Sequence, residues 1–297
     1  MTVSAFPYVG GKTRFAGWIT DHFADHMCYV EPFGGAAGVL LNKEPSRVEI
    51  YNDLNSDVVH FFEVLRERRE ELEDWLSLVP HAREVHEEWA REFYDGHRSE
   101  DDIERAGRWF YLRYTQFGAK LNGYSGYKNS TKRNVARTYH NNAAALDEIA
   151  ARFRNVQLEN RDWKDVVERN DSPDTFFYFD PPYVDCERYY NVDHFDHTAF
   201  EATLSELEAD WLVSYEELPE SFAARDEYHY GSLETTYSLD VKEGEKRDEV
   251  TERIVMNYDP DEREQFRGAQ TTLVQADGGR NQRYLNTGSE QGGGASD

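Results

Sequence analysis

The stretch Thr175-Phe176-Phe177-Tyr178-Phe179-Asp180-Pro181-Pro182-Tyr183 is an apolar run that ends in an acid, two prolines and a tyrosine. The apolar run predicts a strand, and the two prolines cannot continue a sheet ladder. They fix the backbone so that its carbonyl groups project from the strand end. The segment therefore combines a carboxylate, a rigid turn and an aromatic face at one strand terminus.

This combination suits an amine nucleophile on a flat ring. Exocyclic amines of nucleobases are poor nucleophiles because their lone pair is conjugated with the ring, so a site must hold the N–H groups and turn the lone pair toward an electrophile. Asp180 and the Pro181 carbonyl are candidate acceptors, and Tyr183 is a candidate stacking partner. The candidate catalytic set is Asp180, Pro181, Pro182 and Tyr183. A strand followed by a proline-rich turn explains these four residues equally well.

Three further elements precede this motif. Residues 6–12 hold a glycine pair between an aromatic and a lysine, so backbone can approach a ligand closely. Residues 29–42 predict a strand, a glycine-rich turn and a helix, an arrangement that receives nucleotide-like ligands in open α/β sheets. Residues 48–55 predict a strand ending near Asp53, where such folds place a carboxylate on ribose hydroxyls. Together the three elements outline an adenosine pocket.

Each element alone has an ordinary structural explanation. A Gly-Gly-Lys sequence is more often a turn than a ligand site, and an Asn-Asp pair is usually a loop or a cap. The pair Gly10-Gly11 before Lys12 lacks the glycine spacing of a phosphate-binding loop, which argues against an ATPase.

In this order the motifs resemble the Dam-type (D12 class) DNA adenine N6-methyltransferases, over roughly residues 6–258. The resemblance implies an α/β, Rossmann-like sheet that binds S-adenosylmethionine, with a mostly helical DNA-recognition insert. It also implies methyl transfer to N6 of an adenine flipped out of duplex DNA, with no metal ion. The cofactor residues it indicates are Tyr8, Gly10, Gly11, Lys12, Glu31, Phe33, Gly35, Asp53 and Asp180.

One position departs from the family pattern. The glycine-rich turn often has a second glycine where this chain has Ala37, followed by Gly38, so packing near the methionine end of the cofactor is expected to differ slightly. Two alternatives stay open. A cytosine N4-methyltransferase uses the same amine chemistry, but its motif usually begins with Ser instead of Asp180. A catalytically silent DNA-binding module would need no cofactor pocket.

Length and composition predict an intracellular, cytoplasmic globular protein. The chain has 297 residues, of which 39% are hydrophobic and 14% aromatic, enough for a sizeable core. Cys28 and Cys186 are far apart, which argues against a disulfide framework or a zinc site. No apolar stretch approaches the ~20 residues of a membrane span, and the sequence does not begin with a signal peptide.

The formal charge of −25 is unusual for a protein that binds DNA, because phosphate neutralisation normally supplies most non-specific affinity. Residues 105–154, however, hold ten Lys or Arg against two acids, a local charge of 10 − 2 = +8. A solvated basic helix is the simpler explanation, but interleaved glycines, tyrosines and amides favour a shaped loop that contacts DNA. The candidate contacts are Arg113, Gln116, Lys120, Asn122, Tyr124, Lys128, Lys132, Arg133 and Arg137.

The acidic remainder indicates a host with high internal salt, such as a halophilic archaeon or its virus, where an acidic surface stays soluble. An acidic surface that mimics nucleic acid is the alternative, and the basic segment argues against it. The expected partner is double-stranded DNA, bound by a monomer, with no membrane contact; the family also leaves room for a cognate restriction endonuclease.

Alternating strands and helices predict a parallel sheet. Residues 1–66 and 155–258 are expected to form the catalytic domain, residues 67–154 the target-recognition insert, and residues 259–297 a disordered polar tail. Helices are expected at 36–43 and from 56 to about 75, and a loop at 117–139. Closing strands are expected at 228–233, 236–241 and 253–258.

Overall fold

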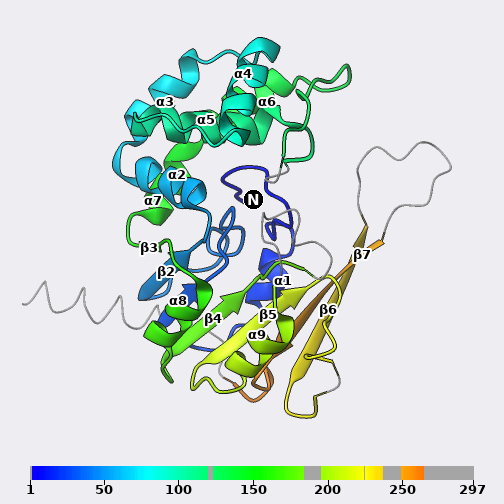
Figure 1. The fold of residues 1–297 in the computed structure, drawn as a ribbon. Coiled ribbons are helices and arrows are strands. Elements are labelled where there is room, and N and C mark those ends of the chain that lie inside the picture. The colour runs from blue at the N-terminus through cyan, green and yellow to red at the C-terminus, as the bar shows by residue number, and fades with distance from the viewer. Residues whose placement is uncertain (1, 120–122, 184–194, 224, 237–248, 264–297) are drawn as a thin grey trace, which may run out of the picture.

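The computed structural model describes residues 2–119, 123–183, 195–223, 225–236 and 249–263. Its centre is a seven-stranded sheet in the order β3-β2-β1-β4-β5-β7-β6 (Figure 1). The first five strands in this order pair in parallel, and β7 pairs antiparallel with both β5 and β6. The strands are β1 (Cys28–Glu31), β2 (Val48–Asn52), β3 (Gln157–Glu159), β4 (Thr175–Phe179), β5 (Asp210–Tyr215), β6 (His229–Thr236) and β7 (Glu249–Met256). The predicted α/β sheet is confirmed.

The central strands are buried on both faces, and successive side chains enter two different apolar clusters. In β4, Phe176 and Tyr178 join one cluster, whereas Phe177 and Phe179 join the other. All five β4 residues are buried, which explains the uninterrupted aromatic run in the sequence. The strand ends immediately before Asp180, as the two prolines predict.

The helices cover the two faces of the sheet. The helices α1 (Ala16–Thr20) and α2 (Ser56–Glu67) contribute to the first cluster, and α8 (Trp163–Asn170) and α9 (His197–Leu204) contribute to the second. In the described residues, no helix is long and apolar enough to cross a membrane.

A helical cap sits beyond one end of the sheet, at the top of Figure 1. Its members are α3 (Arg69–Leu78), α4 (Arg83–Tyr94), α5 (Asp102–Thr115), the short 3-10 helix η1 (Phe117–Ala119) and α6 (Val135–Ala143). The helix α7 (Leu146–Phe153) lies lower in this view, beside α2. The helix α5 packs against α2, α3, α4 and α6. Its buried residues belong to the same cluster as one face of the sheet, so the hydrophobic core is continuous from the sheet into this insert.

Several predicted element boundaries are wrong. Residues 36–43 form consecutive turns, because Ala37 has a positive φ of 55° and interrupts any helix there. The helix expected from 56 to 75 breaks at Arg68, whose φ and ψ of −132° and 38° are not helical. The loop expected at 117–139 gives way to α6 at Val135. The expected strand at 236–241 and the polar tail lie almost wholly outside the described residues.

Candidate active site

A cavity of about 960 Å³ opens at the carboxyl edge of the parallel strands. All residues that the resemblance indicates for the cofactor line this cavity: Tyr8, Gly10, Gly11, Lys12, Glu31, Phe33, Gly35, Asp53 and Asp180. They come together because the segments that follow β1, β2 and β4 leave the sheet at the same edge. From the candidate catalytic set, Pro182 also lines the cavity, whereas Pro181 and Tyr183 do not.

The turn after β1 is built for close approach. A Cβ on Gly34 would lie 2.0 Å from Cε2 of Tyr51, so only glycine fits there. Gly35 has φ +49°, and an added Cβ would lie 2.9 Å from a ring carbon of Tyr8. Ala37, the departure from the family pattern, has φ 55° and is fully buried. The position thus requires the left-handed backbone that glycine adopts most easily, and here alanine adopts it at a cost of about 1–2 kcal/mol.

Asp53 anchors this turn at the end of β2. Its Oδ2 accepts a hydrogen bond of 2.8 Å from the Gly35 backbone N–H, and its Oδ1 accepts one of 2.7 Å from the Asn55 N–H. Burial raises the pKa of Asp53 to about 6, although both hydrogen bonds oppose the shift. The carboxylate is therefore held against the glycine turn while it lines the cavity, and each oxygen keeps a second lone pair.

Glu31 ends β1 beneath the same turn and is 2% exposed. Its Oε2 accepts a hydrogen bond of 2.9 Å from the Tyr29 hydroxyl. Burial raises the pKa of Glu31 to about 8, with Asp180 adding to the shift and Tyr29 opposing it. The cavity floor therefore contains a carboxyl group that holds its proton near neutral pH.

Lys12 joins the N-terminal loop to the motif that follows β4. Its Nζ lies 2.7 Å from Oδ1 of Asp180 and 3.8 Å from Oε1 of Glu252, and it donates a 2.8 Å hydrogen bond to the Gly10 carbonyl. Burial opposes its charge, yet the two carboxylates hold the pKa of Lys12 above its ordinary value. Burial likewise raises the pKa of Asp180, against the effect of Lys12.

Tyr183 lies beside this group but does not line the cavity. It is 9% exposed, and its hydroxyl donates a 2.8 Å hydrogen bond to Oε1 of Glu252. The Lys12 ammonium lies 4.6 Å from the centre of the Tyr183 ring. In the described conformation, the ring is therefore covered by a cation instead of being open for stacking.

Two site residues were not predicted from the sequence. Glu252 in β7 is 3% exposed, and burial raises its pKa to about 6. Ser214 in β5 donates a 3.3 Å hydrogen bond to Oδ1 of Asp180 and bonds the Tyr178 hydroxyl at 2.9 Å. Neither had a clear sequence signal, because β7 reads Glu-Val-Thr-Glu-Arg-Ile-Val-Met and Glu252 is one of two glutamates in it, while Ser214 is a single serine in β5.

Two of the candidate DNA contacts prove to be buried inside the insert. Arg113 and Gln116 are each 1% exposed. The Arg113 guanidinium stacks on the Trp109 ring at 4.2 Å, and the Gln116 amide bonds the Tyr94 hydroxyl at 2.8 Å and the Gly123 carbonyl at 3.1 Å. In this conformation neither side chain is accessible to DNA, because the α5 face that bears Arg113 packs inward and Gln116 closes the loop after it.

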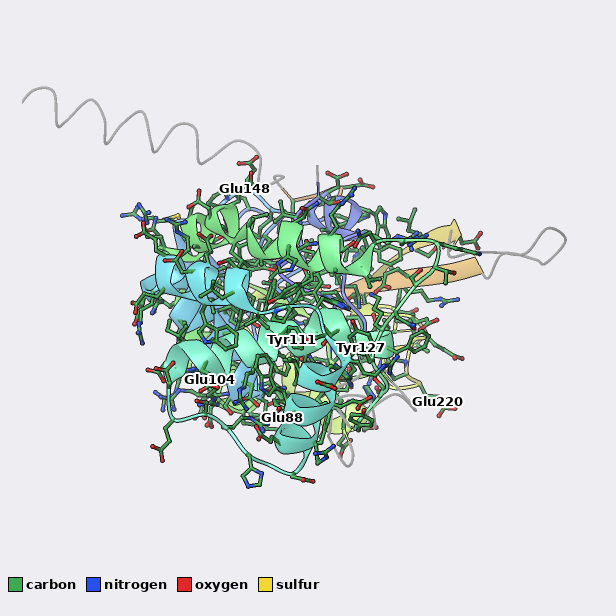
Figure 2. All side chains as sticks on the ribbon, turned by 90° about the horizontal axis from the view of Figure 1, so that it is seen from above. Glu88, Glu104, Tyr111, Tyr127, Glu148 and Glu220 are labelled. Carbon is green, nitrogen blue, oxygen red and sulfur yellow. The ribbon has the colours of Figure 1, made fainter. Side chains whose placement is uncertain are left out.

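Other candidates are accessible. Figure 2 looks down on the insert, with Tyr111 and Tyr127 near the middle of this view and Glu88, Glu104 and Glu148 around them. Tyr124 is 53% exposed, Lys128 is partly exposed, and Lys132, Arg133 and Arg137 are exposed. Across the described ranges, the last three form no ion pair with an acid. Lys120 and Asn122 lie outside the described residues.

The cavity, the sheet order and the position of the acidic motif after β4 fit a methyltransferase. Residues 8–252 match the family model of the D12 class N6 adenine-specific DNA methyltransferases. The chain therefore belongs to this family, and its reaction is the methylation of adenine N6 in DNA.

Characterised relatives agree with this family. A DNA adenine methylase of Escherichia coli K12 is 29% identical over 215 residues, 69% of this chain and 75% of the relative. The Type II methyltransferase M.MjaIII of Methanocaldococcus jannaschii is 27% identical over 199 residues, 59% of this chain and 67% of the relative. The Type II methyltransferase M1.LlaDCHI of Lactococcus lactis is 23% identical over 279 residues, 84% of this chain and 94% of the relative.

Proposed function

We propose that the cavity at the carboxyl edge binds S-adenosylmethionine and that Asp180 holds the amine of a flipped adenine at its end. One observation supports this most strongly: all of the expected cofactor residues, which come from four separate segments of sequence, line a single cavity. Its chemistry also fits the cofactor. The glycine turn allows close approach, Asp53 can accept from ribose hydroxyls, and the carboxylate of Asp180 suits a sulfonium cation.

Within this site, S-adenosylmethionine supplies an electrophilic methyl group. Asp180 would accept a hydrogen bond from one N6–H, and the Pro181 carbonyl, which does not line the cavity in the described conformation, would accept from the other once the base is bound. Both bonds turn the lone pair of the amine away from the ring and toward the methyl group. With the cofactor bound, N6 would receive the methyl group, S-adenosylhomocysteine would leave, and the cationic amine would lose one proton to solvent.

The target base must leave the helix because N6 lies inside the base pair. Flipping costs a few kcal/mol, and stacking on Tyr183 would offset part of it. The Tyr183 ring does not line the cavity in the described conformation, so this role requires it to turn toward the base. Tyr8, Phe33 and Asp53 are assigned to the adenosine end of the cofactor, and Asp180 to the reacting amine.

Site specificity is assigned to the insert, residues 67–154, with residues 1–66 and 155–258 as the catalytic part. The accessible candidates Tyr124, Lys128, Lys132, Arg133 and Arg137 are proposed to contact duplex DNA. The enzyme is proposed to act as a cytoplasmic monomer without a metal ion, alone or beside a cognate restriction endonuclease.

Modification-sensitive sequencing of DNA from cells that express the chain tests the reaction and its target together. We expect N6-methyladenine at one short sequence, absent from cells expressing Asp180→Ala. Methylation of cytosine N4 without adenine methylation would contradict the assignment. Calorimetry with S-adenosylmethionine distinguishes an enzyme from a catalytically silent DNA-binding module. A folded protein that binds no cofactor would favour the silent module.

Exchange of the insert with that of a relative should transfer the target sequence. An unchanged target sequence would show that specificity lies outside the insert.

A further inference from the structure

The two groups assigned to the target adenine are already engaged by one side chain. The Lys12 ammonium lies 2.7 Å from Oδ1 of Asp180 and 4.6 Å from the Tyr183 ring centre. The ammonium thus donates to the Asp180 carboxylate and covers the Tyr183 ring. These are the same two contacts that the target adenine is proposed to make. Lys12 lines the cavity whereas Tyr183 does not, which agrees with a lysine that covers the ring from the cavity side.

We propose that Lys12 is a displaceable placeholder for the target adenine, and that Glu252 takes over its ammonium when the base enters. This inference rests on the proposed function, because it assumes that adenine binds between Asp180 and Tyr183. It makes Glu252 a positioning residue that acts through Lys12.

The burial of Lys12 explains why a second carboxylate is needed. Lys12 is 4% exposed, and a buried cation that loses its partner is strongly disfavoured. Oε1 of Glu252 lies 3.8 Å from its Nζ, so a movement on the order of 1 Å brings the two to hydrogen-bond distance. Glu252 is itself buried, with 3% exposure, and so provides a carboxylate that is shielded from solvent.

The same oxygen atom links Lys12 to Tyr183. Oε1 of Glu252 accepts the Tyr183 hydroxyl at 2.8 Å in the described state. If the Tyr183 ring turns toward an entering base, its hydroxyl leaves this oxygen, which then becomes available to the ammonium. The movement of the stacking ring and the transfer of Lys12 are therefore coupled.

The fold explains how Glu252 reaches this position. Because β7 runs antiparallel to β5, residues near its beginning lie at the edge where the parallel strands end. Glu252 precedes Arg253, which pairs with Tyr215 near the carboxyl end of β5. A parallel strand would have placed the same residue at the opposite edge, away from Lys12.

The test uses the duplex identified by sequencing, with 2-aminopurine at the target position. Its fluorescence rises when the base leaves the stack, and this readout requires no methyl transfer. We compare Glu252→Gln, Lys12→Met and the double variant, and also measure kcat/KM on the unmodified duplex. Glu220→Gln is the control, since Glu220 is an exposed acid in the segment after β5.

We expect Glu252→Gln to reduce both the fluorescence rise and kcat/KM about 10-fold, because the displaced ammonium has lost its second partner. Lys12→Met should retain the fluorescence rise. Adding Glu252→Gln to Lys12→Met should change either quantity less than about 2-fold, since there is no ammonium to receive. The control should behave as wild type.

Three outcomes would overturn the inference. The first is that Glu252→Gln loses the same factor with and without Lys12. The second is that it matches Glu220→Gln, and the third is that Lys12→Met abolishes the fluorescence rise, which would mean that Lys12 holds the base itself. Lys12→Gln replaces Lys12→Met if the latter does not fold. Failure of the proposed function is distinct, because the wild type would then make no N6-methyladenine at all.

Discussion

The carboxyl edge of the sheet and the exposed face of the insert use charge in opposite ways. At the sheet edge, Lys12 is surrounded by the acids Asp180 and Glu252, and all three are largely buried. On the insert, Lys132, Arg133 and Arg137 are exposed. Buried charges interact strongly and shift each other's pKa, whereas exposed charges are screened by salt and interact mainly with a large, highly charged partner.

This difference separates the two tasks of a DNA methyltransferase. Chemistry on an amine depends on the geometry of a few groups in a dry site, and association with DNA depends on the number of accessible cations. A basic residue in the insert is not necessarily available to DNA. Arg113 is an example, because it lies in the insert and yet is only 1% exposed. Substitutions in the two regions should therefore differ in which quantity they change.

The largest effect is expected for Asp180→Ala. Loss of the acceptor for the amine should lower the methyl transfer rate on the order of 1,000-fold or more, while DNA affinity stays close to that of the wild type. Single-turnover transfer of a labelled methyl group measures the rate. Asp226→Ala, which changes an exposed acid, is the control. A rate within a few-fold of the wild type would remove Asp180 from the reaction.

Next in size is the combined change of Lys132, Arg133 and Arg137 to Ala. Each lost phosphate contact should lower the slope of log K against log salt concentration by about 1 and weaken binding to all sequences alike. Titration of duplex DNA across a salt series measures this slope.

Arg113→Met is the matched comparison within the insert. It should reduce the free energy of unfolding by about 1–3 kcal/mol through the buried Trp109 contact and leave the salt slope unchanged. The salt dependence of DNA binding could instead stay unchanged in the triple variant or fall in Arg113→Met. Either result would contradict the inference that the exposed cations bind DNA and the buried Arg113 does not.

A smaller effect is expected for Asp53→Ala. Removal of this carboxylate should weaken S-adenosylmethionine binding about 10-fold, equivalent to about 1.4 kcal/mol, with little change in rate at saturating cofactor. Calorimetry gives the affinity and single-turnover kinetics give the rate. If Asp53→Ala and Asp180→Ala lowered the saturated rate equally, the division between cofactor and amine would fail.

The last prediction concerns Glu31 and the change of stability with pH. The folded-state pKa is raised from 4.5 to about 8, so between these values the native state binds more protons at Glu31 than the unfolded state does. Stability should therefore fall as pH rises through this window, by at most about 1.4 kcal/mol per pH unit from this group. Glu31→Gln should remove this part of the slope in urea unfolding at pH 5 to 8, and Glu44→Gln, at an exposed acid, should not. Identical slopes for wild type and Glu31→Gln would show that the carboxyl is not protonated as inferred.

The order of motifs along the chain was sufficient to predict the cavity. In a parallel sheet, the segments that follow each strand emerge at one edge, so residues after β1, β2 and β4 had to meet. That topological rule connects Gly35, Asp53 and Asp180 without any knowledge of side-chain contacts. The prediction of a high-salt host rests on composition alone and stays a prediction.

Tertiary structure alone decided which polar groups complete and cover the site. Glu252 reaches Lys12 because β7 is antiparallel, and strand direction follows from pairing with β5 and β6. Arg113 and Gln116 are buried because α5 packs on three sides within the insert, which no local pattern of charges reveals. A sequence motif specifies the backbone at a strand end through short-range sterics, whereas burial and ion pairing depend on elements far apart in the chain, and these meet only in the folded protein.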